Sequence, residues 1–159
     1  MFGLNPNIIR IRRSNLTYGV GVLSRFDKNK HSSDKKIIIN GTEWCKNVFD
    51  KFLGIDECVS IDETIMRRYA TINKFNQNQI NIDFYSSSES DCEYTTDQGV
   101  KKCGTIILYL DKLDHFSKTN INHREIQIKM SFGETEIKIN AVDVLTGKWV
   151  KSTIEFLER

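Results

Sequence analysis

The sequence lacks the residue patterns that mark several common kinds of site. It contains no G-x-x-x-x-G-K and no G-x-G-x-x-G loop, so nothing in it is expected to cradle the phosphates of a nucleotide. Its acidic clusters, residues 62–63 and 91–93, fall in polar stretches, and no pattern sets a nucleophile beside a base. The sequence therefore predicts no catalytic residue and no ATP hydrolysis by this chain.

Metal-binding patterns are missing as well. No C-x-x-C pair occurs, and none of the three histidines stands at a zinc spacing from a cysteine. The sequence predicts no metal site and no cofactor, and it favours reduced thiols of a cytoplasmic protein at the four cysteines, Cys45, Cys58, Cys92 and Cys103.

Long apolar runs and an excess of one charge are also absent. The longest apolar run, residues 106–110, has the length of a buried strand and not of a membrane span. A net charge of +2 gives no strong steering field. No signal-peptide pattern begins at Met1. We therefore expect no membrane span, and no nucleic acid among the partners.

What the sequence does contain is strand texture, from about residue 60 onward. Short runs alternate apolar with polar residues, as in strands that bury one face. These runs are residues 64–72, 80–85, 105–110, 125–132, 136–143 and 149–156. Gly133-Glu134 and Thr146-Gly147 are typical hairpin turns. The pattern predicts an all-β domain, an antiparallel β-sandwich of about eight strands.

One segment departs from this texture and predicts a helix over residues 43–53. Its apolar residues recur at the spacing of one helix face. They are Trp44, Val48, Phe49, Phe52 and Leu53. We expect this helix to pack on the sandwich within an insertion of about residues 24–51.

The stretch of residues 8–23 opens the domain. It begins with the alternation of a half-exposed strand or an extended linker, and continues as a strand that contains Gly19 and Gly21. Glycine inside a strand usually marks a bulge or the close approach of another backbone. Such a strand could receive an extended peptide.

The same stretch carries a resemblance. Ser-Asn-Leu-Thr-Tyr-Gly-Val-Gly, residues 14–21, resembles the Thr-Pro-Leu-Ser-Leu-Gly-Ile-Glu segment that opens the substrate-binding domain of the 70-kDa heat-shock chaperones. A divergent subgroup of that family, the 12A and 12B type, resembles the chain in further blocks that follow in order along nearly its whole length. These are FGLNP, RIRRSNLTYGVGVLSRF, TEWCKNVFDKF, GVKKCGT, REIQ, FGETEIK and GKWVK.

The resemblance implies a division of the chain and a function. Residues 1–13 would be the tail of a nucleotide-binding domain with its linker, and residues 14–159 a substrate-binding-type β-sandwich without the helical lid of typical relatives. Such a domain binds extended hydrophobic segments of unfolded polypeptides, with co-chaperones as further partners. ATP and Mg²⁺ would bind the full-length protein, outside this chain.

The resemblance also implies which residues contact a peptide. Carried over position by position, they remain apolar, and the same positions would suit an ordinary core. They are Val20, Val22, Leu23, Tyr69, Ala70, Ile72, Ile80, Ile82 and Ile126.

Two departures from the family leave an alternative function open. The usual linker is apolar and ends in an aspartate that couples the two domains, whereas Arg12 or Arg13 stands near that position here. This weakens the expectation of ATP-driven coupling. The insertion could also cover the groove. The alternative is a protein-interaction module with a closed groove, which binds folded partners through its loops.

Overall fold

The computed structural model describes residues 10–71, 79–109 and 124–155. Almost all regular structure in these residues is extended, apart from one short 3-10 turn, Ser33–Lys35. The strands are β1 (Ile11–Arg13), β2 (Thr17–Arg25), β3 (Lys36–Ile39), β4 (Thr42–Leu53), β5 (Cys58–Ser60), β6 (Glu63–Thr71), β7 (Gln79–Ser87), β8 (Val100–Tyr109), β9 (Arg124–Phe132), β10 (Glu136–Asp143) and β11 (Trp149–Glu155).

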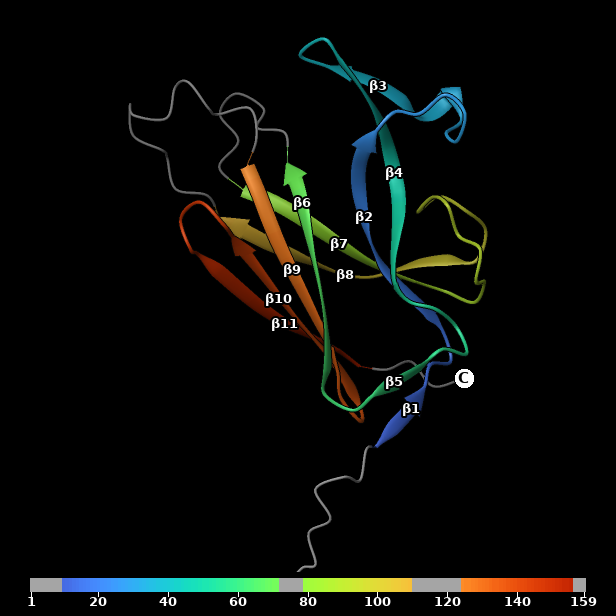
Figure 1. Ribbon diagram of the computed structural model, residues 1–159, viewed down its shortest axis with the longest axis vertical. Coiled ribbons are helices and arrows are strands. Elements are labelled where there is room, and N and C mark those ends of the chain that lie inside the picture. The colour runs from blue at the N-terminus through green and yellow to red at the C-terminus, as the bar shows by residue number, and fades with distance from the viewer. Residues whose placement is uncertain (1–9, 72–78, 110–123, 156–159) are drawn as a thin grey trace, which may run out of the picture.

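Two larger antiparallel sheets enclose the core, which confirms the predicted β-sandwich (Figure 1). One sheet has the order β3-β4-β2-β7-β8, and the other has the order β11-β10-β9-β6. Period-two alternation explains the packing, because β10 buries Ile137, Ile139 and Ala141 while Lys138 between them is exposed. None of the helical structure in the described residues has the length and hydropathy of a membrane-spanning helix.

The prediction of a helix over residues 43–53 is wrong, because this segment is strand β4. Its pairing with β2 slips twice: Val22 pairs with Val48 but Ser24 with Cys45, and a second shift follows Tyr18. At each shift β4 contains one residue more than β2, which is a β-bulge. Two extra residues stretch the period-two pattern of buried side chains until it imitates the spacing of a helix.

A tight hairpin leads into β4. Ile39 pairs with Thr42, so the loop consists of Asn40 and Gly41, which have φ values of 51° and 79°. Two consecutive positive φ values are typical of a type I′ turn, for which Asn-Gly is the strongest sequence signal. The hairpin extends the five-stranded sheet beyond the sandwich (Figure 1).

The segment before β2 lies along the domain's own surface. β1 pairs with β5, and the backbone amide of Ser14 donates to the carbonyl of Glu57 over 3.0 Å. Arg10 forms an ion pair with the Glu134 carboxylate, and the Arg12 guanidinium donates to the Glu134 carbonyl. The side chains of Arg10 and Arg12 therefore contact the β9–β10 turn, whereas Arg13 Nε lies 4.0 Å from the Asp56 carboxylate.

Candidate functional site

A fork between β2 and β7 positions the candidate site. The two strands pair only where residues 17–20 face residues 84–87, and then they separate. No described strand pairs with residues 21–25 of β2 on this side, or with residues 79–83 of β7 on the side facing β2. The fork thus contains two strand edges whose backbone groups have no ladder partner in the described residues (Figure 1).

A pocket of about 310 Å³ occupies the fork, and we call it the fork pocket. Its volume lies at the lower end of the range for ligand-binding pockets. The residues that line it are Gly21, Val22, Leu23, Lys46, Asn47, Tyr69, Ala70, Ile80, Asn81, Ile82, Asp83, Tyr85, Thr95, Ile126 and Ile128.

Most of the predicted peptide-binding residues come together in the fork pocket. Seven of the nine line it: Val22, Leu23, Tyr69, Ala70, Ile80, Ile82 and Ile126. Val20 does not, because its side chain is fully buried in the core below. Ile72 lies outside the described residues.

Atoms of neighbouring strands and loops lie close to the two strand glycines, Gly19 and Gly21. A Cβ at Gly19 would stand 2.3 Å from the carbonyl oxygen of Asp50, so the close backbone is that of β4. A Cβ at Gly21 would stand 2.9 Å from the Tyr85 ring and 3.2 Å from the methyl group of Thr95. The space at Gly19 is therefore not open to a peptide, while Gly21 lies at the wall of the fork pocket.

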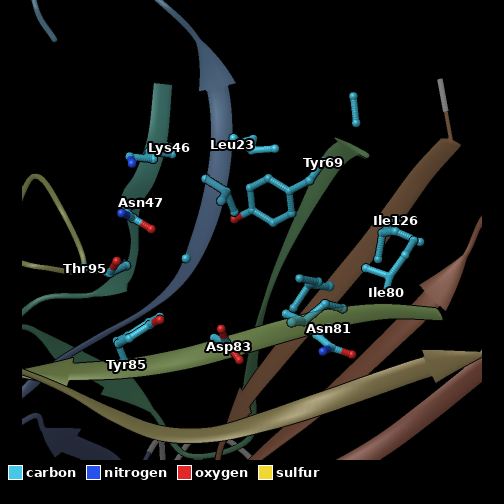
Figure 2. A pocket seen from close by; sticks show the side chains of 15 residues that line it. Leu23, Lys46, Asn47, Tyr69, Ile80, Asn81, Asp83, Tyr85, Thr95 and Ile126 are labelled. Carbon is cyan, nitrogen blue, oxygen red and sulfur yellow. The ribbon is translucent and has the colours of Figure 1, made fainter. Parts of the chain in front are cut away.

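The fork pocket also has a polar side, which the sequence did not predict. Leu23 faces the first bulge of β4, where Lys46 and Asn47 stand opposite one residue, and Asn47 has a φ of 59°. The backbone amide of Thr95 donates to the Asn47 carbonyl over 2.8 Å, which places the segment after β7 beside the bulge. In Figure 2, Lys46, Asn47 and Thr95 lie on the other side of β2 from Tyr69.

A polar contact between the two sheets holds one wall of the fork pocket. The hydroxyl of Tyr69 on β6 donates to the Asp50 carboxylate on β4, and Arg67 Nη1 lies 3.4 Å from the same oxygen. Arg67 also donates to the Lys51 carbonyl over 3.1 Å and lies over the ring of Phe52. Burial, and next the hydrogen bond to Asp50, raise the pKa of the Tyr69 phenol well above its ordinary value. We call Arg67, Tyr69 and Asp50 the inter-sheet clamp.

The chemistry of the fork pocket suits binding. Asp83 Oδ1 lies 3.1 Å from Lys102 Nζ and accepts a hydrogen bond of 2.6 Å from the Thr105 hydroxyl, so its charge is already compensated. Among the described residues, no group of histidine, cysteine and acidic side chains could hold a metal ion. All four cysteines are free thiols. The lining combines an aliphatic side with a few polar groups, which is typical of ligand-binding pockets.

Comparison with known proteins gives specific relatives, although no family model matches the chain. The chain is 47% identical over 157 residues to heat shock 70 kDa protein 12A of Homo sapiens, and 48% identical over 157 residues to its Mus musculus counterpart. It is 39% identical over 160 residues to heat shock 70 kDa protein 12B of Homo sapiens. Each alignment covers 99% of this chain but only 23% of the relative, in its C-terminal part.

Proposed function

Because this chain belongs by its sequence with the C-terminal region of the heat shock 70 kDa protein 12A and 12B family, we propose that it binds extended hydrophobic segments of polypeptides, as a chaperone-type domain. The observation that carries this proposal is the fork pocket. It is bordered by two strand edges that have no ladder partner among the described residues, and aliphatic side chains line one of its sides. An extended peptide needs both features, because an edge bonds its backbone and a pocket receives a side chain.

The contacts set the expected affinity. An aliphatic side chain that enters the apolar side gains roughly 1.5–3 kcal/mol by leaving water. Ordering a flexible peptide costs a comparable amount, so the backbone hydrogen bonds supply most of the surplus. Dissociation constants on the order of micromolar or weaker follow.

The test uses fluorescence polarisation with a library of short hydrophobic peptides. Leu23→Asp places a charge in the fork pocket at a half-buried position, where the fold should survive. Ile38→Asp is the matched control, because Ile38 is 66% exposed on β3 and does not line the pocket. We expect peptides to bind the wild type and the control, and to bind Leu23→Asp at least about ten-fold more weakly, the effect of about 1.4 kcal/mol.

Two outcomes would contradict the proposal. If no hydrophobic peptide binds the wild type, the alternative of an interaction module that uses its loops replaces it. If Leu23→Asp remains folded by circular dichroism and binds as the wild type does, the fork pocket is not the binding site.

This chain spans 23% of the length of its relatives, so functions of the full-length proteins can depend on regions outside it. We propose that the binding of ATP and Mg²⁺ belongs to the part of the full-length protein outside these residues. Co-chaperones as partners, and any coupling of nucleotide state to peptide release, are proposals of the same kind.

A further inference from the structure

The described lining of the fork pocket contains one cation, Lys46. The carboxylate in the same lining, that of Asp83, is paired with Lys102. The adjoining Asp50 is held by Arg67 and Tyr69. Lys46 forms no ion pair with a described residue. Its charge is the smallest of the influences that lower the pKa of Asp34, and the hydrogen bond from Ser32 is the largest.

Lys46 lies at the opposite end of the fork pocket from the aliphatic side chains. Lys46 belongs to the bulge opposite Leu23, and its neighbours Asn47 and Thr95 are polar but neutral. Ile80 and Ile126 lie on the other side of β2 (Figure 2). The described lining therefore has aliphatic side chains at one end and a lysine at the other.

We propose that the fork pocket selects extended segments in which an aspartate or glutamate flanks the buried apolar residue on one side only, where its carboxylate pairs with Lys46. This selectivity rests on the proposed peptide binding. It follows from charge complementarity, since a carboxylate at the polar end meets an unpaired cation, whereas a lysine there meets repulsion. It is one-sided because the described residues that line the aliphatic end include no cation.

The expected effect is modest because Lys46 is exposed to water. Ion pairs between exposed groups are weak, so an acidic flank should tighten binding about two- to five-fold over its neutral amide. Salt screens such a pair, and the preference should shrink as the ionic strength rises toward 1 M.

The test compares peptides that share one apolar centre and have aspartate, asparagine or lysine at each flanking position in turn. They are titrated into the wild type, Lys46→Met and Lys46→Glu, with Lys101→Met as the matched control. Lys101 is an exposed lysine of β8 that does not line the fork pocket. We expect the wild type and the control to prefer aspartate on one flank, Lys46→Met to lose the preference, and Lys46→Glu to prefer lysine there.

The outcomes separate the two proposals. If the asparagine peptides fail to bind the wild type, peptide binding itself is refuted and the selectivity falls with it. If they bind but aspartate gives no advantage on either flank, only the selectivity is refuted. A preference that persists in a folded Lys46→Met variant would assign it to another residue.

Discussion

Replacing Gly19 with alanine tests how closely β4 lies against β2. A Cβ at this position would stand 2.3 Å from the Asp50 carbonyl oxygen and 2.7 Å from a ring carbon of Phe49. The ring could rotate, but the carbonyl is fixed by the ladder, in which Gly19 pairs with Lys51 and Val20 with Asp50. One of the two strands therefore has to move.

The cost can be estimated from two opposing effects. Forcing an extra carbon into a packed core costs about 1–3 kcal/mol, and a clash with backbone lies at the upper end of that range. Alanine also reduces the entropy of the unfolded chain, which returns about 0.4–1 kcal/mol. We expect Gly19→Ala to lose about 2 kcal/mol of unfolding free energy, which for a domain of this size lowers Tm by about 4–8 °C.

The matched control is Gly104→Ala in β8. A Cβ there would have no atom within 4 Å, and Gly104 does not have a positive φ. This variant should be neutral or more stable by up to about 1 kcal/mol. Urea and thermal unfolding followed by circular dichroism would measure both. If the two variants unfold within about 0.5 kcal/mol of each other, the close approach of β4 to Gly19 is refuted.

Two further predictions concern β4 and the inter-sheet clamp. Trp44 is only 7% exposed, so Trp44→Ala should cost about 3–5 kcal/mol in urea unfolding, and a loss below about 0.5 kcal/mol would show that the indole is not packed. Tyr69 has a raised pKa in the folded state, so its contribution to stability is complete below its ordinary pKa near 10 and is lost as the pH rises above it. Unfolding at a series of alkaline pH values should therefore show a steeper loss in the wild type than in Tyr69→Phe, and equal slopes would contradict the half-buried hydrogen bond to Asp50.

Strands with an uninterrupted ladder could be predicted from the sequence. β9 and β10 pair in a continuous register from Phe132–Ile137 to Ile126–Asp143, so alternate residues keep to one face along both strands. Burial then follows sequence parity, and the hydrophobic pattern is sufficient. The hairpin turn between them, at Gly133, follows from the same local information.

β4 could not be predicted from its hydrophobic pattern, because a bulge is defined by the partner strand. The residues opposite Leu23, and the extra residue near Tyr18, are set by pairing with β2. The local sequence signal for a hairpin before β4 is the Asn40-Gly41 dipeptide. This turn signal is stronger evidence than the helical spacing of the residues that follow.

The two sides of the fork pocket also differ in how far the sequence could predict them. The aliphatic side combines residues at regular positions of β6, β7 and β9, and most of them are among the residues for which the resemblance implied a contact with a peptide. The polar side depends on the bulge at Lys46 and Asn47 and on the segment at Thr95, which lie far apart in sequence. No pattern within either segment indicates that they meet.

The two bulges that made β4 resemble a helix in the sequence also determine which residues of β4 lie at the fork pocket. The bulge opposite Leu23 brings Lys46 into the lining of the fork pocket, and the bulge beside Gly19 lies next to Asp50, where β6 is clamped to β4. In a regular strand paired residue for residue, one extra position would not be available at either place. We infer that both the selectivity and the wall of the fork pocket depend on the length of β4. Deleting Lys46 should therefore remove the bulge and its charge together, leave Asn47 as the single residue opposite Leu23, and abolish the preference for an acidic flank.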